Sequence, residues 1–321
     1  MTVTGRFAPS PSGRMHLGNV FCALLAWLSV RSQGGRMVLR IEDLDPARCR
    51  PEYAAQLEDD LRWLGLTWDE GGAAGGSSYF QSTRSSVYAA AFETLRAQGL
   101  AYPCFCTRAE LHAASAPHLS DGRTVYAGTC RDLSADEVRR RSLNRTPAWR
   151  LRVPDEDIGF RDGLQGFYSE NLARSTGDFI LRRSDGVYAY QLAVVVDDAA
   201  QGVTEVLRGR DLLDSTPRQL YLYRQLGLTP PGFSHIPLLL APDGRRLSKR
   251  DRDLDLGALR ARCPSPEPLL GHLAHFAGLL PYPAPVTANS LIPRFSVDLL
   301  PNVDVLMGER IYRALADSAH L

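Results

Sequence analysis

Lysine is almost absent from this 321-residue sequence: of its 37 basic residues, 36 are arginine and only Lys249 is lysine. A narrow site beside a phosphate favours a compact ammonium group over a planar guanidinium, although chance is the alternative explanation for one lysine. Long apolar runs are also missing, since the longest, 20–30, is interrupted by Ser29 and is too short to span a bilayer. No basic start leads into an apolar run at the N-terminus, so we predict no signal peptide, no membrane partner and a cytoplasmic location.

The overall composition excludes further classes of protein. Hydrophobic residues make up 44% and charged residues 23%, which excludes a disordered or collagen-like chain. The net charge of +1 neither favours nor excludes a nucleic-acid partner. Locally, 139–152 holds six arginines and no acid, and 245–252 holds five basic residues and one acid. Such runs are either solvated surface or phosphate-binding surface, and composition leaves both open.

The first hundred residues alternate between strand and helix patterns. We expect strands over 2–8 and 37–41, and helices over about 17–33, 51–64 and 83–99. This alternation predicts a parallel α/β sheet. After Gly99 come clustered cysteines, scattered arginines and short strand candidates at 149–153 and 179–181.

The later part of the chain returns to a buried pattern. The run 194–196 predicts a central strand, and 215–227 predicts a helix that Gly227 ends. On a strand, Asp197 and Asp198 would point to opposite faces, so we interpret them as structural rather than as a catalytic pair. We divide the chain into the first half of an α/β domain (1–100), an inserted module (101–186), the second half (187–240), and a loop with a small helical C-terminal domain (241–321).

The loop after the first strand suits phosphate binding. The turn Pro9-Ser10-Pro11-Ser12-Gly13 leads into His16-Leu17-Gly18-Asn19 at the start of a helix, where backbone N–H groups are free and the helix dipole favours an anion. The His16 ring is placed to bond a phosphate, with a capping or packing role as the alternative. The G-x-x-x-x-G-K-[ST] phosphate loop is absent.

The only lysine lies in a second basic segment, 246–250, within a loop rich in glycine and arginine. A mobile loop with one lysine suits a cation that closes on a triphosphate as negative charge develops. A solvated basic loop is the alternative.

These two segments together resemble the two signature motifs of class I aminoacyl-tRNA synthetases. The stretches 6–19, 41–45 and 208–212 are similar to the glutamyl subgroup of that family. Asn19 departs from the last position of the HIGH motif, and Leu247 and Arg250 replace two residues of KMSKS, while Lys249 keeps the lysine position. The resemblance extends over about 4–255 and implies a Rossmann catalytic domain with a parallel sheet.

Only 256–321 follow this region, which leaves no room for the large anticodon-binding domain of full-length glutamyl-tRNA synthetases. The chain therefore resembles the short members of the subgroup, the glutamyl-Q tRNA(Asp) synthetases, and Ser12 in the turn agrees with them. This resemblance implies a ligase that activates glutamate with ATP without needing tRNA. It then implies transfer of glutamate to queuosine in the anticodon loop of tRNA(Asp).

The resemblance also assigns site residues. It places ATP at His16, Gly18, Asn19, Ser248 and Lys249, with His16 and Lys249 catalytic. It places glutamate at Arg6, Phe7, Ala8, Pro9, Ser10, Glu42, Tyr190 and Arg208. Elementary chemistry agrees, because the substrate amino group needs an acid such as Glu42, and a carboxylate is best held by an arginine such as Arg6 or Arg208.

Three cysteines with close spacing predict a metal site, because a disulfide framework is not expected without an export signal. They are Cys104, Cys106 and Cys130. Three unrelated buried cysteines are the alternative. A closed tetrahedral site needs a fourth ligand, for which His112, His118 and Tyr126 compete and histidine is the usual choice. The family resemblance favours Tyr126, and it implies one structural zinc ion per chain.

The implied chemistry needs no covalent enzyme intermediate. The α-carboxylate of glutamate attacks the α-phosphorus of ATP in line and releases pyrophosphate, so catalysis is positioning and charge stabilisation. Mg²⁺ is expected with ATP, and we expect a monomer. The alternatives are a truncated glutamyl-tRNA synthetase that charges the 3′ end of tRNA(Glu), a catalytically inactive tRNA-binding paralogue, and a small-molecule adenylyltransferase.

Overall fold

A computed structural model describes residues 2–113, 125–247, 254–309, 311–312 and 315. At its centre lies a five-stranded sheet in the order β10-β9-β1-β2-β3, in which every pair of neighbours is parallel. The strands are β1 (Thr4–Phe7), β2 (Arg36–Leu39), β3 (Glu70–Gly71), β9 (Glu205–Gly209) and β10 (Gly232–Ile236). Strand order reverses between β1 and β9, and ligands of such sheets bind outside the carboxyl ends of the strands at that point. The predicted parallel α/β fold is confirmed.

Helices α1 (Leu17–Ser32), α2 (Pro51–Trp63), α7 (Tyr190–Ala200) and α8 (Thr216–Leu226) cover this sheet. Helix α3 (Ser85–Ala97) packs against α7 and α8. The predicted helices at 17–33, 51–64, 83–99 and 215–227 are confirmed to within two residues at each end. Gly227 ends α8 with a φ of 65°, a left-handed conformation that favours glycine. Short 3₁₀ turns, η1 (Ala73–Gly75), η2 (Ser77–Tyr79), η3 (Gln81–Thr83) and η4 (Arg210–Ser215), connect the elements.

The predicted strand at 194–196 is wrong. These valines lie in α7, where every residue from Leu192 to Asp198 is buried. A short run of apolar residues that is buried on all sides has the same pattern in a central strand and in a buried helix. Helix α7 continues through Asp197 and Asp198, so the two residues do not alternate between opposite faces as they would on a strand. The strand-based argument about them therefore fails.

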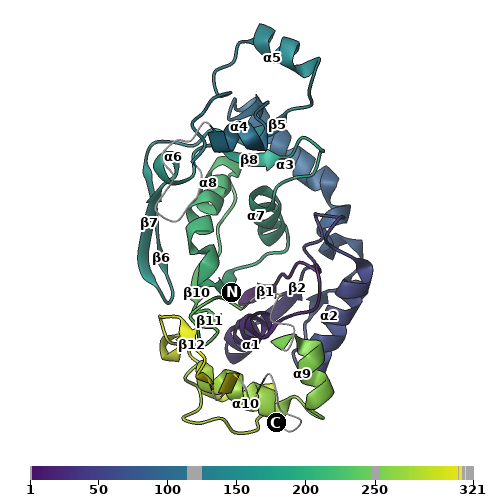
Figure 1. Cartoon of the computed structure of the whole chain (residues 1–321), viewed down its shortest axis with the longest axis vertical. Helices are drawn as coiled ribbons and strands as arrows, with labels where there is room; N and C mark the ends of the chain where they lie inside the picture. The colour runs from purple at the N-terminus through teal and green to yellow at the C-terminus, as the bar shows by residue number, and fades with distance from the viewer. Residues whose placement is uncertain (1, 114–124, 248–253, 310, 313–314, 316–321) are drawn as a thin grey trace.

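The chain between the two halves of the parallel sheet forms an antiparallel sheet of its own, at the top of Figure 1. Its strands are β4 (Ala101–Cys104), β5 (Ala148–Leu151) and β8 (Phe179–Arg182), which agrees with the strands expected at 149–153 and 179–181. Helices α4 (Arg108–Ala113), α5 (Ala135–Ser142) and α6 (Leu172–Ser175) accompany it. A hairpin of β6 (Asp157–Asp162) and β7 (Gly166–Asn171) runs beside α8 down to β10.

Helix α10 (Glu267–Phe276) lies beneath α1 in Figure 1, and the pair of β11 (Leu239–Leu240) and β12 (Val305–Leu306) lies to its left. The other segments of this part are α9 (Leu256–Arg262), α11 (Ala288–Leu291), η6 (Ile292–Arg294) and η7 (Val297–Leu299). Their apolar residues share one core with α1, β1, β2 and α2, and a second core joins α3, α7, α8 and the antiparallel sheet. Within the described part of the chain, no helix is both long and apolar enough to cross a bilayer.

Candidate active site

A cavity of about 560 Å³ lies at the carboxyl ends of β1, β9 and β10. The structure brings together in its wall every described residue that was assigned to ATP or glutamate: Arg6, Phe7, Ala8, Pro9, Ser10, His16, Gly18, Asn19, Glu42, Tyr190 and Arg208. Ser248 and Lys249, which were also assigned to ATP, lie outside the described residues. Residues from four separate parts of the sequence thus meet at the predicted edge of the sheet.

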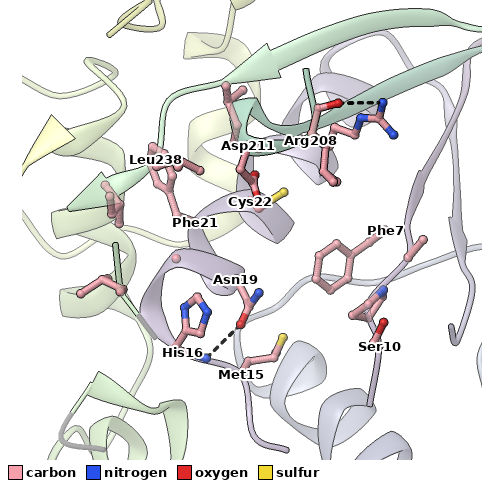
Figure 2. Close-up of a pocket in the computed structure, with 18 of the residues that line it drawn as sticks. Phe7, Ser10, Met15, His16, Asn19, Phe21, Cys22, Arg208, Asp211 and Leu238 are labelled. Carbon is pink, nitrogen blue, oxygen red and sulfur yellow. Dashed lines mark hydrogen bonds between the residues drawn. The ribbon is translucent and has the colours of Figure 1, made fainter. Parts of the chain in front are cut away.

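The N-terminus of α1 forms one side of the cavity (Figure 2). His16 is the N-cap residue, and its backbone N–H donates to Asn19 Oδ1 over 3.2 Å. The first turn holds no acidic side chain, so nothing there competes with an anion for the helix dipole. At Gly18 a Cβ atom would lie 3.1 Å from His16 Cε1, so glycine allows the ring to lie against the helix start. Phe7 and Ser10 lie across the cavity in this view.

Arg208, from the end of β9, is buried in the opposite part of the cavity wall. Its Nη2 donates to Thr216 Oγ1 over 2.8 Å and to the Leu212 carbonyl over 3.3 Å, and its Nε donates to His235 Nε2 over 3.0 Å. Among the described residues, its Nη1 is buried with no hydrogen-bond partner. A buried N–H group without an acceptor is costly, and a substrate carboxylate in the cavity would satisfy it.

Glu42 follows β2 and is buried beside a fully buried arginine, Arg40. Arg40 Nη2 donates to Glu42 Oε1 over 3.2 Å, and Arg40 Nη1 donates to Asp198 Oδ1 over 2.6 Å. Asp198 Oδ1 also accepts from Arg6 Nε over 3.4 Å. Burial raises the pKa of Glu42, and the charges of Arg40 and Arg6 oppose this rise. The Arg40 guanidinium therefore binds Glu42 directly, and it also binds Asp198, which in turn accepts from Arg6.

Asp197 anchors α7 to the 3₁₀ turns and to α3. Its Oδ1 accepts from Arg84 Nε over 2.6 Å, and its Oδ2 accepts from Gln81 Nε2 and the Tyr88 hydroxyl, each over 2.8 Å. Both aspartates are thus structural, as expected, although they act from a helix and in one connected ion network.

Tyr190, the first residue of α7, lines the main cavity and two neighbouring hollows. Besides the main cavity, it lines a hollow of about 430 Å³ toward the antiparallel sheet and another of about 380 Å³ beside Cys49 and Arg183. Burial raises the pKa of Tyr190, so its phenol is protonated at neutral pH.

The wider comparison with known proteins agrees with this geometry. Residues 2–277 match the catalytic domain of class I tRNA synthetases (E and Q). A protein of Symbiobacterium thermophilum named glutamyl-Q tRNA(Asp) synthetase is 52% identical over 317 residues, which cover 97% of this chain and 98% of the relative. The chain belongs to the glutamyl-Q tRNA(Asp) synthetase family.

A second relative of the same name and a solved structure of a glutamate tRNA ligase are also similar to the chain. A protein of the same name from Nitratidesulfovibrio vulgaris is 50% identical over 93% of this chain and 94% of its own length. The crystal structure of a glutamate tRNA ligase from Elizabethkingia meningosepticum, in complex with its amino acid, superposes with a TM-score of 0.84 at 28% identity. It covers 98% of this chain and 69% of that ligase. The class I synthetase fold predicted from the sequence is confirmed.

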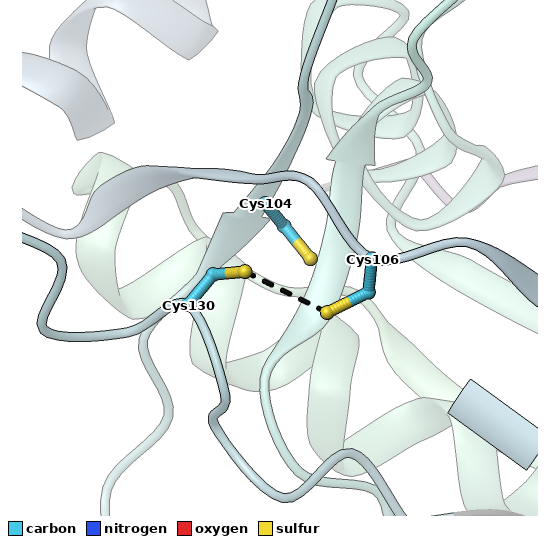
Figure 3. Close-up of side chains that lie close together, drawn as sticks. All are labelled: Cys104, Cys106 and Cys130. Atoms are coloured by element: carbon cyan, nitrogen blue, oxygen red, sulfur yellow. Dashed lines mark hydrogen bonds between the residues drawn. The ribbon is translucent and has the colours of Figure 1, made fainter. Parts of the chain in front are cut away.

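The cysteines of this glutamyl-Q tRNA(Asp) synthetase family member meet as predicted (Figure 3). The sulfur atoms of Cys104, Cys106 and Cys130 all lie within 4.8 Å of one another, and those of Cys106 and Cys130 are 3.6 Å apart. Tetrahedral sulfur ligands around zinc, each at about 2.3 Å, would lie about 3.8 Å apart. The cluster therefore fits a metal ion of that coordination.

Tyr126 lies beside this cluster. Its Oη is 3.5 Å from Cys104 Sγ and accepts from the Cys130 backbone N–H over 2.9 Å. An oxygen at about 2.0 Å and a sulfur at about 2.3 Å from one tetrahedral ion would be about 3.5 Å apart. Of the competing ligands, His118 lies outside the described residues, and for His112 only its place in α4 is described.

Arg150 completes the surroundings of the cluster. Its Nε donates to Cys104 Sγ over 3.3 Å, and its guanidinium lies 3.8 Å from the centre of the Tyr126 ring. Burial alone would raise the pKa of the Cys104 thiol, but the Tyr126 hydroxyl, the Cys106 amide and Arg150 lower it below its ordinary value. Arg150 belongs to the basic run 139–152, yet its side chain is buried and contacts the cysteine cluster instead of forming part of the protein surface.

Sequence reasoning missed several residues that support the site. Arg40, Asp162, Thr216 and His235 are all buried. Arg40, Thr216 and His235 contact residues that line the cavity, and Asp162 lies behind His235. No short motif marks any of them, and Arg40 is one of 36 arginines. Only its position two residues before Glu42, at the end of a buried strand, could have pointed to it.

Proposed function

We propose that this chain activates L-glutamate with ATP, without tRNA, and then transfers the glutamate to queuosine in the anticodon loop of tRNA(Asp). The observation that carries the proposal is the cavity in which Arg6, Glu42, Tyr190 and Arg208 face the N-terminus of α1. An acid and two arginines suit the charges of glutamate, and the helix N-terminus suits a phosphate. The names of the relatives support the acceptor.

In the first step, the α-carboxylate of glutamate attacks the α-phosphorus of ATP. A bond forms between carboxylate oxygen and phosphorus as the bond to pyrophosphate breaks, which yields glutamyl-adenylate. Glu42 holds the substrate ammonium group, Arg6 and Arg208 hold carboxylate, and His16 with the α1 amides binds phosphate oxygens. Lys249 neutralises the leaving pyrophosphate. Catalysis is positioning and charge stabilisation, because no nucleophilic side chain is needed.

In the second step, a hydroxyl group of queuosine attacks the activated carbonyl. The ester bond forms, AMP leaves with the electron pair of the mixed anhydride, and the hydroxyl proton goes to solvent or to the departing phosphate. The hollow of about 430 Å³ that shares Tyr190 with the main cavity offers space for the acceptor nucleoside.

Two metal ions complete the proposal. One structural Zn²⁺ is held by Cys104, Cys106, Cys130 and Tyr126, and it fixes a region of the chain that has only a small core of its own. Mg²⁺ accompanies ATP. We also propose a monomer that acts in the cytoplasm, where ATP and tRNA are available, and we keep the division at 100/101, 186/187 and 240/241.

A charging assay tests the acceptor. Labelled glutamate is supplied with ATP and tRNA from cells with and without queuosine, and half of each tRNA sample first loses its 3′-terminal adenosine by enzymatic trimming, which leaves the queuosine diol intact. We expect label only on tRNA(Asp) that contains queuosine, and we expect it to survive the trimming. Label on tRNA(Glu) that trimming abolishes would instead identify a truncated glutamyl-tRNA synthetase.

Exchange of pyrophosphate into ATP tests the first step by itself. We expect exchange that depends on glutamate and needs no tRNA. A catalytically inactive tRNA-binding paralogue would give no exchange, and a small-molecule adenylyltransferase would consume ATP without any labelled tRNA.

A further inference from the structure

A buried hydrogen-bonded chain lies behind Arg208 and has no role in the reaction described so far. It runs from Asp162, at the end of β6, to His235 on β10 and then to Arg208 on β9. All three side chains are at most 3% exposed. Two contacts, Asp162 to His235 and His235 to Arg208, thus connect the β6–β7 hairpin to the wall of the amino-acid cavity. In the sequence, this hairpin lies between the two halves of the parallel sheet.

The contacts fix which nitrogen of His235 carries the proton. Arg208 Nε–H can only donate, so His235 Nε2, 3.0 Å away, must accept. The proton of the neutral ring then lies on Nδ1 and is donated to Asp162 Oδ2 over 2.5 Å. Asp162 therefore selects the tautomer that Arg208 requires.

Asp162 is itself held in one orientation. Its Oδ1 accepts from three backbone N–H groups, those of His235 at 3.1 Å, Leu164 at 3.0 Å and Gln165 at 2.9 Å. The hairpin tip is also fixed on β10, because Gly163 N donates to the Phe233 carbonyl over 2.9 Å. Oδ2 is thereby the oxygen that faces the imidazole.

The chain of contacts orients the Arg208 guanidinium. Nε is bound to His235 and Nη2 to Thr216 and Leu212, so Nη1 is left for a ligand. We propose that His235, oriented by Asp162, is a positioning residue that aims Arg208 at a carboxylate of the amino-acid substrate. This inference rests on the proposed function, since it assumes that Arg208 binds that carboxylate.

The groups around His235 agree with a neutral ring. Asp162 faces Nδ1, Arg208 and Thr216 face Nε2, the rings of Phe160 and Phe233 lie against the imidazole, and Arg6 acts from the cavity. Burial lowers the pKa of His235, Asp162 opposes this, and the charges of Arg208 and Arg6 lower it further. If the ring were protonated, its Nε2–H would face the Nε–H of Arg208, and two hydrogen-bond donors would oppose each other.

The substitution Asp162→Asn tests the proposal with almost no change in shape. The asparagine oxygen must stay on the three backbone N–H groups, so its amide group faces His235 Nδ1 and donates to it. The ring then carries its proton on Nε2 and opposes Arg208. We expect the KM for glutamate in pyrophosphate exchange to rise about tenfold, the effect of losing one charge-assisted hydrogen bond. The KM for ATP should stay within about twofold of the wild-type value, because the N-terminus of α1 does not contact Asp162 or His235 in the described part of the structure.

Asp157→Asn is the matched control, because it makes the same chemical change at the exposed start of the same strand. We expect wild-type kinetics from it. If Asp162→Asn leaves the KM for glutamate unchanged, or raises the KM values for both substrates alike, the positioning role is refuted. Absence of glutamate-dependent exchange in the wild type would refute the proposed function instead, which separates the two failures.

A double-mutant cycle tests whether Asp162 acts through His235. In His235→Gln, the side-chain oxygen can still accept from Arg208, but it no longer depends on Asp162. Adding Asp162→Asn to this variant should therefore change the KM for glutamate less than about twofold. Additive effects would overturn the proposal.

A spectroscopic measurement on the wild type needs no variant of Asp162. In protein labelled with ¹⁵N-histidine, the resonances of His235 are identified by their loss in His235→Gln. We expect a neutral ring with its proton on Nδ1 at neutral pH. A proton on Nε2 would exclude the arrangement that the proposal requires.

Discussion

Arg40 is the cation on which the buried part of the active site depends most, and replacing it with methionine tests this. Methionine keeps a long, flexible side chain but removes the charge. Arg40 is fully buried and lies 2.6 Å from Asp198, 3.2 Å from Glu42 and 3.9 Å from Asp197. The variant would leave three buried carboxylates with fewer partners.

The cost can be bounded from these contacts. Removing one partner of a buried ion pair destabilises a protein by about 3–5 kcal/mol. Asp198 keeps Arg6 at 3.4 Å and Asp197 keeps Arg84 at 2.6 Å, so two of the three carboxylates retain a cation. We therefore expect Arg40→Met to lower the free energy of unfolding by about 3 kcal/mol, the lower end of that range.

The same variant should change how glutamate binding depends on pH. Burial already raises the pKa of Glu42, and Arg40 is the first of the charges that oppose this rise. Without Arg40, the pKa of Glu42 rises further, and only the ionised carboxylate attracts the substrate ammonium group. As the pH falls, the KM for glutamate should rise at a higher pH in the variant than in the wild type, and raising the pH should restore part of the affinity.

Urea unfolding and pyrophosphate exchange across a pH series measure these two effects. Arg36→Met is the control, because Arg36 begins the same strand, is 42% exposed and forms an ion pair with Glu70 at the surface, besides a long hydrogen bond of 3.4 Å to Thr4 Oγ1. Its loss should cost less than about 1 kcal/mol. If Arg40→Met unfolds like this control and keeps the wild-type pH profile, the ion network does not support the site.

Three further predictions concern the nucleotide and the metal. Lys249→Ala should slow glutamate-dependent pyrophosphate exchange about 100-fold with an unchanged unfolding midpoint, and a wild-type rate would exclude its role at pyrophosphate. Gly18→Ala should raise the KM for ATP several-fold and leave that for glutamate unchanged, because the added Cβ would lie 3.1 Å from His16 Cε1; equal changes for both substrates would contradict this. Cys104→Ser should lower the zinc content measured by elemental analysis, whereas Cys263→Ser, at a buried cysteine that ends α9, should keep it; unchanged zinc in the first variant would remove Cys104 from the ligands.

The predictable part of the site is the set of residues that line the cavity. A turn of small residues followed by His16, an acid after a strand at Glu42, and an arginine near the end of a strand at Arg208 each have a chemical reason that is local in sequence. The sheet edge then gathers them, and the structure places all of them around one cavity.

The supporting residues could not be predicted in this way. Asp162 and His235 are 73 positions apart and meet only because a hairpin folds back onto β10. In α7, the valines at 194–196 match a strand and a buried helix equally well, and tertiary packing decides between them. Reading them as a strand also gave the wrong geometry for Asp197 and Asp198, although their structural role was predicted.

The shared core beneath α1 has a consequence for how the chain unfolds. The first turn of this helix lines the candidate cavity, while its body packs against α11, η6 and β11, which come from the last third of the sequence. Loss of those late segments would expose the apolar side of the helix whose first turn we propose to bind phosphate. Because the first and last parts of the chain share this core, we expect local opening near the C-terminus to loosen the first turn of α1 as well.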